Sequence, residues 1–199
     1  MANVRDTLDE GRFYHIYNHA CGNENIFQQP ENYRFFLKRY QRYIVPVAET
    51  YAYSLMPNHF HLLVRMKEIN SIQNIKRIPI HNNTPDYSHA FGTLFNSYTK
   101  AFNKLYDRKG SLLYQSFKRV RINTEEYLRR LIIYIHLNPV NHEFVSHPSQ
   151  WEFSSYNPII TGQNSFLCIN EVVELFEDKE NFIYNHLPKN NLDDKWTLE

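Results

Sequence analysis

Residues 50–66, TYAYSLMPNHFHLLVRM, decide the fold that this sequence predicts. The runs 50–56 and 60–66 are rich in aromatic and aliphatic residues, which is typical of β-strands. Pro57 and Asn58 separate the two runs, and both residue types favour turns. The stretch therefore predicts two antiparallel strands joined in a hairpin.

The chain on either side of this hairpin predicts further strands and helices. Partly alternating apolar residues predict strands over 12–20 and 114–122, and apolar residues three and four apart predict helices over 30–44, 91–105 and 124–137. We expect Asn138-Pro139 to cap and end the last helix, and the Asn-rich residues 70–87 to form a loop. The order strand, helix, strand, strand, helix, strand, helix predicts an α+β fold, a ferredoxin-like antiparallel sheet with helices packed on one face.

Charge is distributed unevenly along a chain whose formal net charge is only +1. Residues 100–130 carry nine Lys or Arg against three acids, whereas residues 171–199 carry eight acids against three Lys. A local basic region can bind phosphates whatever the net charge, although an ordinary solvated helix and loop is the alternative. We expect one catalytic domain over 1–160 and a peripheral, acidic C-terminal extension over 161–199.

Other features of the composition exclude several classes of protein. No apolar stretch is long enough to span a membrane, and the polar N-terminus lacks the features of a signal peptide, so we expect a cytoplasmic protein. Cys21 and Cys168 lie far apart and form no CxxC pair, which argues against a disulfide framework or a cysteine zinc site. Any metal ion must therefore be held by His, Asn, Gln or carboxylate side chains.

His59 and His61 are the first candidates for a metal site. They lie two residues apart on a predicted strand, so both side chains leave the same face of the sheet. Two adjacent imidazoles can chelate one ion and leave a coordination position open for a phosphate oxygen. With 10 His in 199 residues, about half a His-x-His match is expected by chance. For the pair alone, two partly exposed strand histidines are the more common explanation.

The residues around the pair strengthen the metal interpretation. The string 56–64, MPNHFHLLV, resembles the HUH signature of the single-tyrosine transposases, including REP-associated tyrosine transposases, in which two metal-binding histidines flank one hydrophobic residue. The resemblance extends in order to 13–18, FYHIYN, to the helix of Tyr98, to 134–140, YIHLNPV, and to 151–156, WEFSSY. It covers about residues 11–160, and several ordered motifs are far more specific than one His-x-His.

The resemblance implies a set of site residues. His59 and His61 would hold a divalent metal ion, Mg²⁺ or Mn²⁺, and Tyr98 would be the nucleophile, although a core tyrosine is the commoner explanation for its place on an apolar stripe. The family also implies a polar third ligand about one turn after the tyrosine; Asn103 is the nearest amide, but five residues do not share a helix face. The DNA-binding candidates are the basic residues Lys100, Lys104, Arg108, Lys118, Arg119 and Arg121.

The implied activity is cleavage and rejoining of single-stranded or hairpin DNA through a covalent 5′-phosphotyrosine. A phenol suits this chemistry because it leaves more readily than an alkyl alcohol, so the ester can be reversed by a 3′-hydroxyl without a nucleotide cofactor. Two alternatives stay open, a non-catalytic single-strand binder derived from a transposase and a phosphodiesterase that uses metal-bound water. The resemblance also implies that the chain could act as a homodimer.

Overall fold

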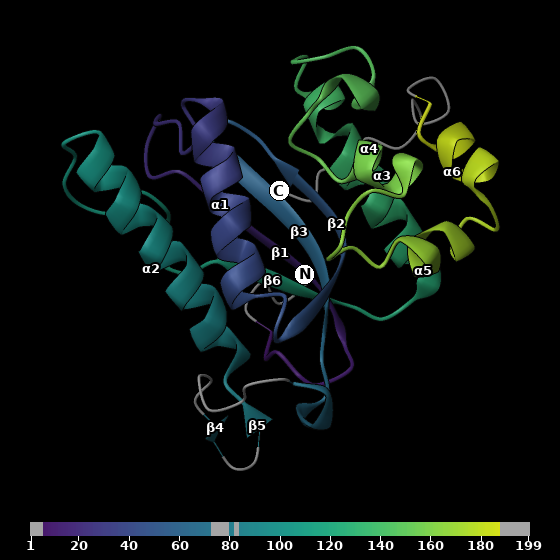
Figure 1. Ribbon diagram of the computed structural model, residues 1–199, viewed down its shortest axis with the longest axis horizontal. Helices are drawn as coiled ribbons and strands as arrows, with labels where there is room; N and C mark the ends of the chain where they lie inside the picture. Colours follow the sequence, from purple (N-terminus) through teal and green to yellow (C-terminus); the bar gives the residue numbers. More distant parts are fainter. Residues whose placement is uncertain (1–5, 73–79, 82–83, 188–199) are drawn as a thin grey trace.

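A four-stranded antiparallel sheet forms the centre of the computed structural model, which describes residues 6–72, 80–81 and 84–187 (Figure 1). The strands are β1 (Phe13–His19), β2 (Ala48–Leu55), β3 (His59–Met66) and β6 (Lys118–Ile122), in the spatial order β2-β3-β1-β6. The main helices are α1 (Pro30–Tyr43), α2 (Tyr87–Leu105) and α3 (Glu125–Asn141). This arrangement confirms the predicted α+β fold with helices packed on an antiparallel sheet.

Short elements complete the chain. They are η1 (Ile69–Ser71), β4 (Ile80–His81), β5 (Thr84–Pro85), η3 (Pro148–Gln150), α4 (Tyr156–Thr161), α5 (Ile169–Glu174) and α6 (Lys179–Asn185). The predicted loop over 70–87 thus contains the small β4-β5 pair, and residues 73–79 and 82–83 of it lie outside the described part of the chain. Among the described helices, none combines the length and the apolar character that a membrane span requires.

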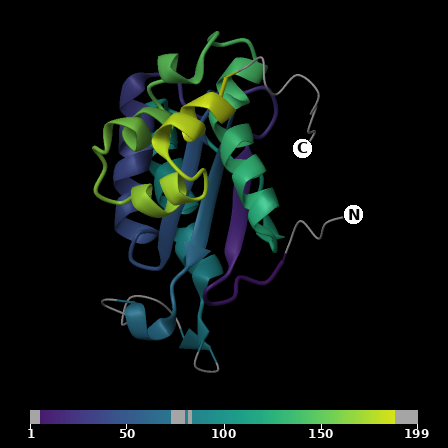
Figure 2. The ribbon, with the colours of Figure 1, turned by 90° about the vertical axis from the view of Figure 1, so that its right-hand side faces the viewer.

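The helices occupy both faces of the sheet, not the single face that we predicted. Phe60 of β3 packs against Phe36 of α1 and Phe95 of α2, so these two helices cover one face. Helix α3 packs against β2 and β3 on the other face. Figure 2 shows the strands between α1 on one side and α3 on the other. Residues that alternate along β3 therefore face two different helical layers.

Side-chain caps set the start of two of these helices. Asp86 accepts a hydrogen bond from the backbone N–H of His89, so α2 begins at Tyr87, four residues before the predicted start. Thr124 accepts from the N–H of Tyr127 and starts α3 close to the predicted place. Such caps satisfy backbone donors that have no partner within the helix.

Helix α3 does not end at Asn138-Pro139, as we predicted, but continues to Asn141 with Pro139 inside it. A proline removes one helical hydrogen bond, and the next turn can still close when later N–H groups find acceptors. Here the N–H of His142 donates to the carbonyl of Asn138 at 3.0 Å. Asn138 is therefore a helical residue with a buried side chain, not an end cap.

The C-terminal segment is part of the core through residue 187. Val172, Phe176 and Phe182 belong to the same buried cluster as the sheet residues. The imidazole of His136 in α3 contacts His186, the residue directly after α6, at 2.9 Å between ring nitrogens. This packing corrects the expectation that the segment after residue 160 is peripheral, and residues 188–199 lie outside the described part of the chain.

Candidate functional site

Strand β3 directs His59 and His61 toward α3. Both histidines are buried, and the intervening Phe60 points to the opposite helical layer. The partner strand β1 contributes His19 and Tyr17 to the same face, because His19 pairs with His59 and Tyr17 with His61 in the antiparallel register. The His19 ring stacks on His59 with 4.9 Å between centroids. The predicted pair thus lies at the centre of a cluster of rings.

Asn138 of α3 completes a three-residue arrangement with the pair. Its Oδ1 lies 2.9 Å from Nε2 of His59, and its Nδ2 lies 3.4 Å from Nε2 of His61. In the described part of the chain, no three His, Cys, Asp or Glu side chains are grouped as a metal site, so the amide is what would complete a ligand set. We did not predict Asn138 as a site residue.

The hydrogen bonds of His59 are compatible with a cation at this place. Its Nδ1 lies 2.7 Å from Oδ1 of Asn58, which can only accept. When Nδ1–H donates to Asn58, Nε2 of the neutral ring carries a lone pair that faces the Oδ1 lone pairs of Asn138. In this form both atoms could coordinate a metal ion, and imidazole nitrogen with amide oxygen suits a borderline divalent ion.

His15 of β1 contacts His61, the second histidine of the pair. Its Nε2 lies 2.9 Å from Nδ1 of His61, and both side chains are buried. Burial lowers the pKa of His15 to about 3. Burial, followed by the neighbouring histidines, also lowers the pKa of His61 below its ordinary value. Both rings are therefore neutral near pH 7, which is the form of imidazole that ligates metals.

Tyr134 of α3 lies beside the pair, as does the buried Tyr17 of β1, whose ring stacks on His61 with 5.7 Å between centroids. The Tyr134 ring packs edge-on against His61 with 5.4 Å between centroids and lies 6.4 Å from His15. Tyr134 is half-buried and precedes Asn138 by four residues, so both side chains leave the same face of α3. This helix brings a phenol and an amide to the two histidines together.

Tyr98 lies on the other side of the sheet. It is buried on α2 among aromatic rings, including Phe27 and Phe36, and its hydroxyl donates to the backbone carbonyl of Ile26. Burial raises the pKa of Tyr98 well above its ordinary value. The structure therefore does not bring the predicted nucleophile to the histidine pair within this chain.

Asn103 is also distant from the pair, at the end of α2. Its Nδ2 donates to the carbonyl of Gly110 at 2.8 Å, and its Oδ1 accepts from Arg108 at 3.0 Å. These contacts fold the turn that follows the helix. The structure therefore places Asn103 away from the predicted histidine pair, beside which Asn138 lies instead.

One of the six predicted DNA-binding side chains lies next to the candidate site. Lys118 is exposed on the edge strand β6, and its ammonium lies 5.3 Å from the centre of the Tyr17 ring. Arg119 and Arg121 lie on the same strand. Their guanidinium groups donate to the Ser88 hydroxyl and to the Asp9 carboxylate, respectively, each at 3.3 Å. Arg108 forms an ion pair with Glu24 at 2.5 Å.

The remaining candidates, Lys100 and Lys104, are exposed on α2. That helix belongs to the layer on the far side of the sheet from the histidines. Their contact with DNA stays a prediction.

A signal in the sequence could have identified the missed residues. Tyr134 and Asn138 are four apart in YIHLNPV, which is the one-turn spacing expected between nucleophile and third ligand. Tyr98 has no polar residue at that spacing, since position 102 is Phe.

Comparison with known proteins supports the fold. No protein-family model and no curated protein matches the chain. The chain is similar to a solved structure of a REP-associated tyrosine transposase bound to a REP hairpin, with a TM-score of 0.59 and 19% sequence identity. The match covers 83% of this chain and 90% of that chain. At this identity the likeness shows that the two proteins share a fold.

Proposed function

We propose that this chain is a metal-dependent, single-strand-specific DNA transposase that cuts and rejoins through a covalent tyrosine link. The observation that carries the proposal is the convergence of His59, His61 and Asn138, with Tyr134 one helical turn away. The shared fold with a transposase bound to hairpin DNA supports it. Hairpin or single-stranded DNA is accordingly the proposed substrate.

His59, His61 and Asn138 would hold a divalent metal ion, Mg²⁺ or Mn²⁺, through two imidazole nitrogens and one amide oxygen. Bound there, the ion would polarise the scissile phosphate and neutralise its developing charge. The protein's own contribution is to direct these three donors from β3 and α3 toward one point. Asn58 and His15 orient the two rings through their Nδ1 atoms.

Tyr134 is the proposed nucleophile. Its phenolic oxygen would form a bond to phosphorus, the bond from phosphorus to the 3′-oxygen would break, and the phenol proton would leave to solvent while the 3′-oxygen takes one up. The product is a 5′-phosphotyrosine with a free 3′-hydroxyl, and a second 3′-hydroxyl can reverse the step. Half-burial suits this role better than the full burial of Tyr98.

Covalent trapping tests the proposal directly. Hairpin oligonucleotides with single-stranded flanks are labelled at the 3′ end, incubated with Mg²⁺ or Mn²⁺, and resolved under denaturing conditions. We expect the label to migrate with the protein, and Tyr134→Phe and His59→Ala to abolish this band. Tyr98→Phe is the matched control, because it removes one hydroxyl from the opposite face of the sheet and should retain the adduct.

Each other outcome points to a different function. An adduct that persists in Tyr134→Phe and disappears in Tyr98→Phe would restore the assignment of Tyr98. Cleavage that releases both ends free would identify a phosphodiesterase that uses metal-bound water. Salt-sensitive binding without any adduct or cleavage would identify a non-catalytic single-strand binder.

A further inference from the structure

Two exposed aromatic rings lie at the end of the sheet that carries the histidine pair. Tyr114 is 57% exposed and Phe144 is 51% exposed, although large aromatic side chains are usually covered. Neither ring is needed to fill the core. Both rings lie near the candidate site.

Tyr114 lies on the β6 side of the histidines. Its backbone N–H donates to the carbonyl of His19 at 3.1 Å, and its own carbonyl accepts from the buried Asn18 side chain at 3.0 Å. Leu113 forms a bridge with Ala20 and is buried, whereas the Tyr114 side chain next to it is exposed at the end of β1 where His19 stacks on His59. These bonds hold the Tyr114 backbone in place beside the site.

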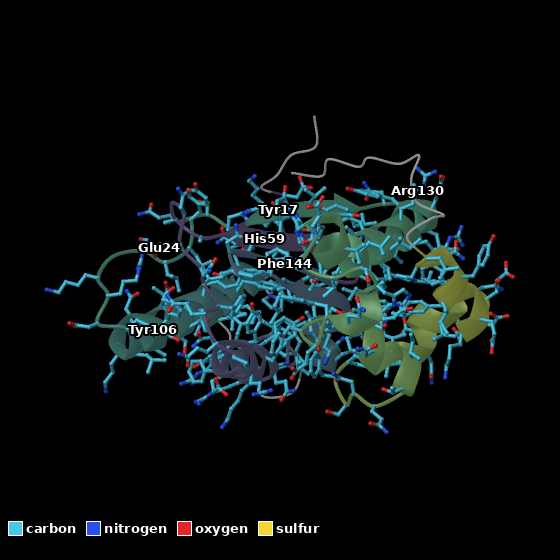
Figure 3. All side chains as sticks on the ribbon, turned by 90° about the horizontal axis from the view of Figure 1, so that it is seen from above. Tyr17, Glu24, His59, Tyr106, Arg130 and Phe144 are labelled. Atoms are coloured by element: carbon cyan, nitrogen blue, oxygen red, sulfur yellow. The ribbon has the colours of Figure 1, made fainter. Side chains whose placement is uncertain are left out.

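Phe144 lies on the β2 side. Its N–H donates to the carbonyl of Pro139 at 3.0 Å, directly after Asn138 in the chain. Its ring packs 5.7 Å from Trp151, which is anchored by a hydrogen bond to the carbonyl of Leu55 at the end of β2. Figure 3 labels Phe144, His59 and Tyr17 in the same region of the molecule.

The two rings therefore flank the histidine pair along one end of the four-stranded sheet. Strands about 4.8 Å apart make this end roughly 15 Å wide, which a few nucleotides of single strand can span. The exposed ammonium of Lys118 lies at the same end, next to Tyr17. Exposed rings with a cation between or beside them are the combination that binds unpaired bases and their phosphates.

We propose that Tyr114 and Phe144 are stacking platforms for unpaired bases on either side of the metal centre, with Lys118 as a phosphate contact. The occupant is single-stranded DNA, and the inference rests on the proposed function. The DNA strand would cross the end of the sheet, with one of its phosphates over the two histidines. A duplex, whose bases are already stacked, does not fit the two rings.

Binding without cleavage tests this path. Fluorescence anisotropy is measured in EDTA with a labelled 20-nucleotide single strand and with the corresponding duplex. Tyr114→Ala and Phe144→Ala should each weaken binding of the single strand about fivefold or more, and Lys118→Gln should reduce the salt dependence of binding. Tyr184→Ala is the matched control, because Tyr184 is 61% exposed on α6, which Figure 3 shows to one side of the labelled Tyr17, His59 and Phe144.

The contradicting results are equally specific. The proposal fails if the parent chain does not bind the single strand, if both ring variants bind like the parent, or if Tyr184→Ala weakens binding as much. It also fails if duplex affinity falls in parallel. If the parent chain forms no tyrosine adduct but single-strand binding weakens when either ring is removed, only the proposed chemistry is refuted. If the adduct forms and both ring variants bind the single strand like the parent, only the proposed surface is refuted.

Discussion

Replacement of His15 by phenylalanine should weaken metal binding without removing any proposed ligand. The His15 ring stacks against Tyr17 and against His61, at 4.6 Å and 5.1 Å between centroids, and those two rings also contact each other at 5.7 Å. Phenylalanine keeps a flat ring of similar size in this stack. What disappears is the nitrogen that contacts Nδ1 of His61 at 2.9 Å.

The magnitude follows from the protonation of His61. Metal coordination through Nε2 requires the proton on Nδ1, where His15 accepts it. Without His15 that N–H is buried and unpaired, at a cost of about 1–3 kcal/mol. The metal-free ring avoids this cost by moving its proton to Nε2, where the Asn138 side chain can be reoriented to accept it. The penalty therefore falls on the metal-bound state, and we expect metal affinity to fall about 10- to 100-fold.

The assay is a titration of the purified protein with Mn²⁺, followed by electron paramagnetic resonance of the free ion or by calorimetry. Tyr98→Phe is the control, because it also removes one buried polar atom and keeps a ring, but on the opposite face. Its metal affinity should equal that of the parent. An unchanged dissociation constant in a folded His15→Phe protein would refute the reasoning, and so would an equal loss in the control.

Three further predictions concern stability. Tyr98→Phe should lower the free energy of unfolding by about 1–3 kcal/mol, because the carbonyl of Ile26 loses a buried donor; urea denaturation with no loss would contradict the buried hydrogen bond. Thr124→Ala and Asp86→Ala should each cost about 1 kcal/mol through loss of a helix cap, and an unchanged denaturation midpoint would contradict the cap in question. Burial lowers the pKa of His186 from 6.5 to about 4. Because the unfolded chain binds this proton first, the free energy of unfolding is highest above pH 6.5 and falls by about 3 kcal/mol as the pH drops to 4. His186→Gln should flatten this pH dependence, and a slope equal to the parent's would contradict it.

The strands were predictable from the sequence because their side chains alternate between two buried layers. Residues 50–66 carry the alternation and the turn within one short stretch. The position of the helices relative to the sheet was not predictable in this way. An apolar stripe shows that a helix is buried on one side, but it does not say which face of the sheet covers it. Tyr98 was assigned to the site from the resemblance of its helix to the family's nucleophile helix, and its apolar stripe could not show that this helix covers the opposite face.

The role of Asn138 was hidden by a strong local rule. Asparagine before proline usually ends a helix, and that rule predicted a helix cap at the residue that we propose as a metal ligand. The tertiary contacts of α3 outweigh the single hydrogen bond that Pro139 removes, so the helix continues past the site. His59 and His61, by contrast, were identified from a spacing that a strand translates directly into a shared face.

The contact between His136 and His186 has a consequence for the order in which the protein is made. His136 stands between Tyr134 and Asn138 in sequence, and its partner is separated from it by fifty residues of later chain. A ribosome makes α6 after α3, so α3 cannot acquire this contact until α6 has emerged. Both histidines of β3 are synthesised long before that moment. We expect the proposed site to reach its final packing only after α6 has been synthesised.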